Sequence, residues 1–193
     1  MTRKIVTDEQ LGQLCRRLND FMRRVEEGTI PLKRAMDDIQ HLIEGKTFQC
    51  YIIDCDADPH VSDGWKVEEH KKGGKFVWDP TRVRLHLSPR QQNGKQINGN
   101  ELRKELAKES VLNANVLDYL LAHPTLIPEE WKDKAVFFWG TIYRLSGGGL
   151  YVRYLDWGSS QWDWHYSWLD DDWRGSHPAA CSPSIFLELC SKI

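Results

Sequence analysis

The stretch AVFFWGTIYRLSGGGLYVRYLDW, residues 135–157, decides the fold. Aromatic and β-branched residues fill both of its halves, and three consecutive glycines at 147–149 separate them. Glycine takes positive φ without steric cost, so such a run allows a tight reversal between two antiparallel strands. The stretch therefore predicts a β-hairpin with one strand on each side of the glycines.

Shorter strand-like and helix-like runs precede this hairpin. Strands are predicted in the β-rich runs FQCYII (48–53), GWKVEEH (64–70), KFVW (75–78) and RVRLHL (82–87), which polar turns separate. The Gln- and Asn-rich run at 88–100 is expected to be an exposed loop. Helices are predicted over 101–109 and 113–123, with one further helical turn at 128–131.

Two amphipathic helices are predicted at the start of the chain. Thr7 and Gln10 match a capping box, and apolar residues follow at helical spacing over 11–25. Pro31 starts a second run, with apolar residues at helical spacing over 32–43. Short turns join the two runs, so the pattern predicts a helical hairpin.

The predicted fold class is therefore α+β. A helical hairpin over residues 1–46 precedes a ligand-binding domain over 47–193 with a mixed, mainly antiparallel sheet. The apolar stripes of the hairpin must be covered. Either they pack on the protein's own domain, or residues 8–44 join another copy and the protein is a homo-oligomer or an assembly subunit.

Composition excludes several classes of partner. The net charge is −2 with Lys+Arg 26 against Asp+Glu 28, which gives no general attraction to nucleic acid or an anionic membrane. The sequence shows neither a secretory signal nor a membrane span, so we expect a cytoplasmic protein, with signal-independent export left open. Five scattered cysteines favour reduced thiols over a disulfide framework.

Acidic residues near the first predicted strand offer an alternative function. Asp54, Asp56 and His60 are residues that a metal-dependent enzyme could use, although Pro59 stands where a calcium loop needs glycine. The sequence has neither a nucleophile elbow nor a phosphate-binding glycine loop. We therefore expect a non-enzymatic protein without metal or cofactor, and keep the metal-dependent enzyme as the alternative.

The run DWGSSQWDWHYSWLDDDWRGSHPAA, residues 156–180, has an unusual composition. It holds five of the nine Trp residues, and the residues between them are mainly short and polar. Residues 135–187 contain no Lys and no Glu. Aromatic and short polar side chains lose little conformational entropy on binding, so this composition is typical of recognition surfaces.

Alternation along the run predicts two faces. If a strand continues through QWDWHY (161–166), Trp162 and Trp164 point to one side while Asp163 and His165 point to the other. We expect the rings to anchor the domain and the polar side chains to face out. The expected framework comprises Trp157, Trp162, Trp164, Trp168 and Trp173.

Codon chemistry adds a second regularity. Apart from the Trp residues and Leu169, every residue from Asp156 to His177 except Gln161 can be encoded by changing only the adenines of an asparagine codon. Trp, whose codon has no adenine, would stay fixed under such a process. The segment thus resembles the variable region of proteins diversified by diversity-generating retroelements. The text LNANVLDYLLAHPTLIPEEWK, VFFWGTIYRL and LYVRYLDW is also similar to a family of uncharacterised proteins from small uncultivated bacteria.

This resemblance implies a C-type-lectin-like fold whose variable residues bind a protein or glycan ligand. The variable, ligand-binding set it implies comprises Asp156, Gly158, Ser159, Ser160, Asp163, His165, Tyr166, Ser167, Asp170, Asp171, Asp172, Arg174, Gly175, Ser176 and His177.

Overall fold

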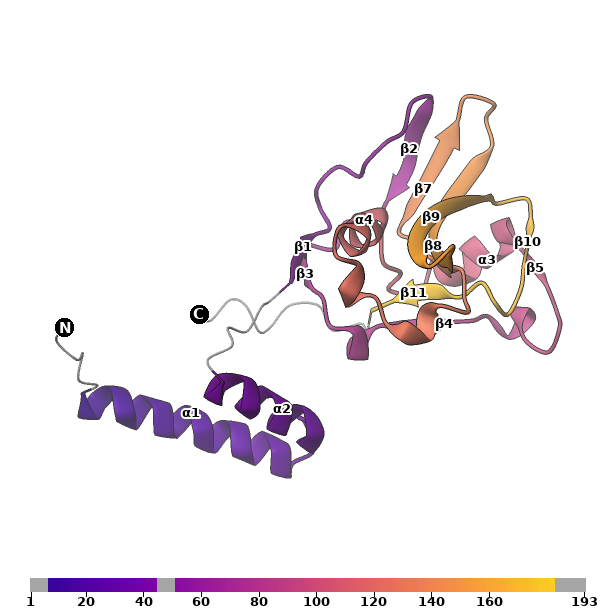
Figure 1. Cartoon of the computed structure of the whole chain (residues 1–193). Coiled ribbons are helices and arrows are strands. Elements are labelled where there is room, and N and C mark those ends of the chain that lie inside the picture. The colour runs from indigo at the N-terminus through magenta and orange to yellow at the C-terminus, as the bar shows by residue number, and fades with distance from the viewer. Residues whose placement is uncertain (1–6, 45–50, 183–193) are drawn as a thin grey trace. The chain divides into compact units, whose positions relative to one another are not determined.

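The computed structural model describes residues 7–44 and 51–182, and the chain divides into two compact units, residues 1–49 and 50–193. The first unit is helical, and the second, called the head below, combines helices with a curled mixed sheet (Figure 1). The predicted α+β class is confirmed. None of the helices in these described ranges has the length and apolar character needed to cross a membrane.

Both predicted helices of the first unit are present. Helix α1 (Asp8–Glu26) begins at a capping box, in which the Thr7 hydroxyl accepts from the Gln10 amide and the Gln10 side chain accepts from the Thr7 amide. Gly28 has a φ of 72° just after the helix, where a side chain would be strained. Helix α2 (Leu32–Ile43) follows Pro31.

The large sheet of the head has the order β2-β7-β8-β6-β11-β4, and β9 also pairs with β8. Its strands are β2 (Trp65–His70), β4 (Arg84–His86), β6 (Val136–Phe137), β7 (Thr141–Leu145), β8 (Leu150–Gly158), β9 (Gln161–Trp168) and β11 (Ala179–Cys181). One edge of β8 is shared by β7 and β6, while β9 pairs along the other. All pairings are antiparallel except that of β11 with β6.

Two short ladders and several helical turns complete the head. Strand β1 (Ile52–Asp54) pairs with β3 (Lys75–Val77), and β5 (Ile97–Asn98) pairs with β10 (Asp172–Trp173). The helices are α3 (Gly99–Leu106) and α4 (Ala114–Ala122), and the 3-10 turns are η1 (Pro80–Arg82), η2 (Pro89–Gln91), η3 (Pro124–Leu126) and η4 (Glu129–Trp131). The expected loop at 88–100 thus contains η2 and β5. The part of the first predicted strand at residues 48–50 lies outside the described residues.

The predicted single strand at 135–145 is wrong, because it breaks into β6 and β7 around Gly140. A Cβ at Gly140 would lie 2.8 Å from the backbone of Asn113, and the Gly140 amide donates to the Leu112 carbonyl at 2.8 Å. This close approach to the chain before α4 turns the backbone out of the ladder. The glycine turn between β7 and β8 is confirmed, and Gly148 has a φ of 86°.

The expected continuous strand beyond 157 is also interrupted. The chain reverses at Ser159 and Ser160, with φ values of 51° and 63°, and returns as β9. Two central residues with positive φ are what a two-residue hairpin turn requires, although Asn and Gly usually occupy them. A second hairpin therefore extends the first.

Two hydrophobic clusters pack against β8. Leu155 belongs to the cluster that includes Val116, Leu117 and Leu120 of α4. Val152 belongs to the cluster that includes Leu102 and Leu106 of α3 together with Trp173. Side chains at odd-numbered and even-numbered positions of β8 thus pack into different hydrophobic clusters.

Candidate functional site

The β8–β9 ribbon carries two rows of side chains. Direct pairs join Trp157 to Trp162 and Leu155 to Trp164, whereas Asp156 pairs with Asp163. Paired residues share a face of the sheet, so the aromatic and polar side chains alternate as the sequence predicts. We call Trp157, Trp162, Trp164, Tyr166 and Trp168 the aromatic row, and Asp156, Asp163, His165 and Ser167 the polar row.

The central rings of the aromatic row face the core. Trp162 and Trp164 are partly buried against the cluster that contains Leu155, while Asp163 and His165 are exposed. Trp157 meets Trp162 edge to face at 5.3 Å between ring centroids. The predicted direction of these two faces is confirmed.

Tyr166 is exposed, as expected for a member of the displayed set. It lies one residue after His165 and so shares the Trp face, where it meets Trp65 edge to face at 4.9 Å between ring centroids. One expectation for this row is wrong. Trp168 was expected to be an inward anchor but is 42% exposed. It lies beside the turn at 146–149, whose serine and glycines offer no side chain large enough to cover the ring.

A buried arginine packs against the aromatic row. Arg153 of β8 is 3% exposed, and its guanidinium lies 4.2 Å from the ring centroid of Trp164. The same group donates to both carboxylate oxygens of Asp118 on α4, at 2.7 and 3.2 Å. Helix α4 is thereby fixed to the ribbon by charge as well as by apolar packing.

The polar row is less uniformly exposed than expected. Asp156 is half-buried, and its carboxylate lies 3.5 Å from Nε2 of His165. The His165 ring is in turn 5.7 Å from that of Tyr154. Burial, followed by the nearby Asp156 charge, raises the pKa of Tyr154.

The segment that follows β9 is held by polar side chains from the run at 88–100. Gln91, 1% exposed, donates from Nε2 to the carbonyl oxygens of Arg174 and His177, each at 3.0 Å. Asn98 donates to the Asp170 carbonyl at 2.9 Å, and Asn100 donates to the Asp170 carboxylate at 2.6 Å. The sequence prediction missed these supporting residues, and the Gln- and Asn-rich composition of the run was their signal.

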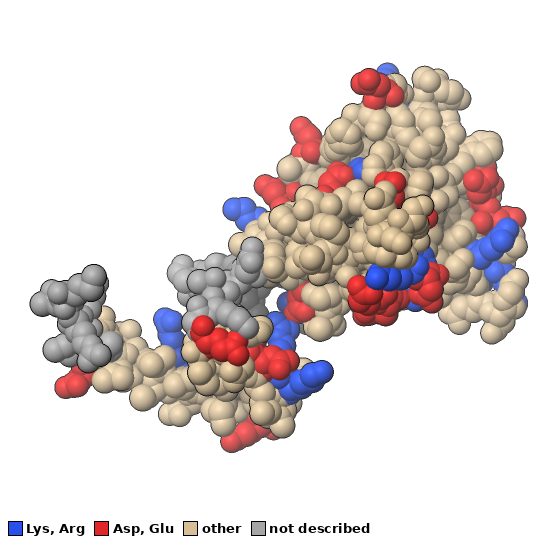
Figure 2. All heavy atoms as spheres, viewed as in Figure 1, with Lys and Arg blue, Asp and Glu red and all other residues tan. Residues whose placement is uncertain are grey.

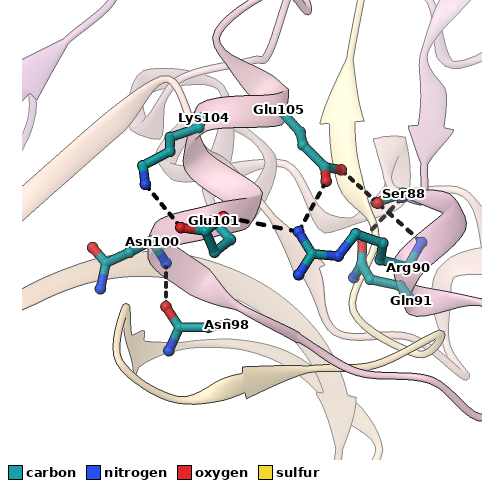
Figure 3. Close-up of polar contacts among 8 residues, drawn as sticks. All are labelled: Ser88, Arg90, Gln91, Asn98, Asn100, Glu101, Lys104 and Glu105. Carbon is teal, nitrogen blue, oxygen red and sulfur yellow. Dashed lines mark hydrogen bonds and ion pairs between the residues drawn. The ribbon is translucent and has the colours of Figure 1, made fainter.

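Figure 3 shows two sets of polar contacts that hold these supports in place. Glu105 of α3 accepts from the Ser88 hydroxyl at 2.5 Å and from Arg90 at 3.5 Å, which ties η2 to the helix. Asn98 caps the same helix by accepting from the Asn100 amide at 3.0 Å. The contacts of Glu105 thus position the turn that carries Gln91, and the cap at the start of α3 holds the two asparagines.

Close packing at the start of α3 fixes the other end of the segment. A Cβ at Gly99 would lie 2.4 Å from Nε1 of Trp173 and 2.5 Å from the Leu169 carbonyl oxygen. Only glycine allows this approach. Trp173 is 1% exposed and serves as the predicted inward anchor.

A polar hollow of about 310 Å³ lies where β9 ends and the segment after it begins. We call it the polar pocket, and its lining residues are Gln96, Ser167, Asp171, Asp172, Trp173, Arg174 and His177. Five of them belong to the predicted variable set. Carboxylate, guanidinium, hydroxyl, amide and imidazole groups therefore gather beside one indole, an arrangement that can form hydrogen bonds with a polar ligand.

His177 is the half-buried imidazole of the pocket. Burial, followed by the neighbouring Arg174 charge, lowers the pKa of His177. The Arg174 amide donates to His177 Nδ1 at 3.4 Å, so the neutral ring carries its proton on Nε2. The pocket thus holds a neutral imidazole at neutral pH.

Most other members of the predicted set lie at the surface. Exposed residues of the set are Gly158, Ser159, Ser160, Asp163, His165, Tyr166, Asp170, Asp171, Asp172, Arg174, Gly175 and Ser176, and half-buried ones are Asp156, Ser167 and His177. Ser159 and Ser160 form the hairpin turn at the far end of the ribbon. The structure therefore brings only part of the set together.

The acidic run of the alternative hypothesis holds a turn. Asp54 accepts from the amides of Asp56 and Ala57, and Asp56 accepts from the Gly74 amide at 2.8 Å. Within residues 7–44 and 51–182, no three His, Cys, Asp or Glu side chains are grouped to hold a metal ion. His60 contributes its backbone carbonyl, which accepts from the Tyr143 hydroxyl at 3.2 Å.

Two larger hollows lie elsewhere on the head. They measure about 360 and 390 Å³, and both are lined by Lys71 and Val111. No residue from 156–177 lines either of them. The polar pocket is smaller, but it is the hollow that unites residues singled out by the sequence.

No protein-family model, curated protein or solved structure matches this chain.

Proposed function

We propose that the protein is a non-enzymatic binding protein whose head recognises a polar ligand, a protein surface or a glycan, through the polar pocket and the adjoining polar row. The observation that carries the proposal is the convergence of Ser167, Asp171, Asp172, Arg174 and His177 on one hollow. Their side chains offer both donors and acceptors.

Rigidity of the surrounding frame supports a binding role. The segment that follows β9 is held by Gln91, and the ribbon is held by the Arg153–Asp118 pair. A preorganised site loses less conformational entropy on binding than a mobile one. Charges of both signs occur on the face of the head shown in Figure 2, which suits a specific polar contact better than general attraction to a polyanion.

We also propose that the binding surface is diversified and that the head has a C-type-lectin-like fold. Both proposals rest on the alternation of Trp with adenine-accessible residues, and variation in the pocket would leave the Trp framework intact. A near-copy of the coding stretch beside a reverse transcriptase gene, differing only where the copy has adenine, would support diversification. A complete genome without such a copy would contradict active diversification.

Binding is tested with the Asp171→Ala/Asp172→Ala/Arg174→Ala variant on a glycan array and on an array of surface proteins. We expect ligands of the wild type to be lost while the thermal midpoint stays nearly unchanged. Asp63→Ala/Glu130→Ala/Lys66→Ala is a control that removes the same charges from exposed positions outside the pocket. Equal binding by both variants would contradict the proposed site.

A further inference from the structure

Large apolar side chains of the helical hairpin are exposed along both helices. Nine of them have exposed fractions between 36% and 74%, namely Leu11, Leu14, Leu18, Met22, Leu32, Met36, Ile39, Leu42 and Ile43. In the described part of the hairpin, residues 7–44, only Ala35 is buried. The largest apolar patch on a typical monomer covers only roughly 300–600 Å², and larger exposed patches mark interaction surfaces.

The spacing of these residues is that of a helix bundle. In α1, Leu11, Leu14, Leu18, Phe21 and Val25 follow alternating steps of three and four residues. This heptad pattern favours packing between helices, in which each side chain enters a hole formed by four residues of the facing helix.

Helix α2 carries two overlapping series of the same kind. One runs through Ala35 and Leu42 and the other through Met36 and Ile43, and both share Ile39. A helix with two adjacent stripes can contact two neighbours, as helices in a four-helix bundle do. Within the hairpin, α1 is one neighbour of α2, so the second stripe of α2 is left for another helix.

The helices of the head do not offer a free apolar stripe. Leu102 and Leu106 of α3 are buried in one core, and Val116, Leu117 and Leu120 of α4 are buried in the other. In the described part of the head, the exposed large hydrophobic residues are Ile52, Val61, Val67, Tyr166 and Trp168, and they do not repeat at heptad spacing. A second hairpin is therefore the better match.

Charge does not oppose pairing of identical hairpins. Residues 7–44 contain six Lys or Arg against eight Asp or Glu, and Figure 2 shows both signs on this unit. Arg23 already pairs within α1 with Asp20 and Glu27. Two copies can thus approach without strong repulsion between like charges.

We propose that two copies of the chain join through the apolar faces of α1 and α2 to form a four-helix bundle. Each copy carries its own head, so the dimer contains two heads. Dimerisation stands independently of the proposed ligand-binding function, since it rests on the hairpin alone.

Analytical ultracentrifugation of the full chain tests the dimer. Wild type is expected at twice the 22.5 kDa chain mass, and Leu14→Lys/Leu18→Lys is expected to raise the dimer Kd by at least about 100-fold, because two charges enter the apolar seam. Gln13→Lys/Asn19→Lys adds the same charge at exposed positions outside the stripe and should leave the dimer intact. A wild type that is monomeric at 100 µM would overturn the proposal, as would equal weakening by both variants.

A second measurement does not depend on how the variants fold. If the bundle forms only between copies, the thermal midpoint of the helical circular dichroism signal rises with wild-type concentration. A midpoint that does not change between 1 and 100 µM would contradict the four-helix bundle.

Discussion

Arg153 on β8 and Asp118 on α4 form a two-pronged ion pair, at 2.7 and 3.2 Å, directly beneath the ring of Trp164. The arginine side chain is 4% exposed, whereas that of the aspartate is 32% exposed. The pair therefore joins the helix layer to the strand that carries the aromatic row. Since the arginine is the buried partner, its charge is the one that needs compensation.

Removing the aspartate should be costly. Asp118→Ala leaves the buried guanidinium without its carboxylate, and we expect a loss of about 3 kcal/mol in the free energy of unfolding. Replacing both partners, as Asp118→Ala/Arg153→Met, should recover most of that loss because no charge remains buried. Urea unfolding of the two variants checks this, and Glu68→Ala at the exposed Glu68–Arg144 pair should change stability less than Asp118→Ala.

The buried amide of Gln91 should matter more than that of its exposed neighbour. Gln91→Ala leaves two carbonyl groups of the segment after β9 and the Ser88 amide without this partner, so we expect about 2 kcal/mol of destabilisation. Hydrogen exchange at residues 174–177 should also become faster. Gln92→Ala is the control, with an expected change within about 0.5 kcal/mol, and equal effects at both positions would contradict the supporting role.

The two serines of the turn between β8 and β9 are not the residues that would stabilise this turn most. Ser159→Asn/Ser160→Gly places the preferred residues at two positions with positive φ, and we expect a gain of about 1 kcal/mol in the free energy of unfolding. Ser159→Val should have the opposite effect, because a β-branched side chain strains this backbone. Thermal unfolding measures both, and a destabilised Asn-Gly variant would show that the turn differs from the one described.

Acid should weaken the fold through His177. Its folded pKa lies below its usual value because of burial and Arg174, so the unfolded chain binds the proton more readily. The resulting stability is complete above the unfolded pKa of about 6.5 and is lost as pH falls through the lowered folded pKa. Urea unfolding at pH 7.5 and 5.0 should show a smaller difference for His177→Gln than for wild type. His60→Gln, at an exposed position, should retain the full difference.

The three described cysteines should differ in reactivity. Burial raises the pKa of the Cys55 and Cys181 thiols to about 12, whereas Cys15 is exposed on α1. Only the thiolate is nucleophilic, so iodoacetamide at pH 8 should modify Cys15 and spare the other two in the folded protein. Peptide mass spectrometry before and after unfolding checks this order, and labelling of native Cys181 would contradict the buried core.

Local sequence patterns predicted the existence of the helices and strands better than the residues at which they begin and end. Thr7 and Gln10 specify a helix start, and the alternation around Asp163 specifies two faces, because both signals depend on neighbouring residues alone. The break at Gly140 depends on contact with Asn113, and the reversal at Ser159 uses residues uncommon in such turns. Neither can be derived from local propensity.

The residues of the candidate site were predicted in part for the same reason. Composition identified its exposed lining, including Asp172 and Arg174. It did not identify Gln91, Asn98 or Asn100, which come from a run more than 50 residues earlier and act through long-range hydrogen bonds. Tyr166 is exposed as expected, and its place on the Trp face follows from its position in the alternation.

The two-row ribbon sets different limits on different kinds of genetic change. A substitution at Asp163 or His165 alters one exposed side chain and leaves the backbone ladder between β8 and β9 in place. One inserted or deleted residue within Gln161–Trp168 would instead turn the following Trp side chains toward water and the polar ones toward the core. This surface can therefore tolerate many changes of residue identity during evolution. It cannot tolerate a change in the length of β9, because the alternation of the two faces depends on the number of residues in the strand.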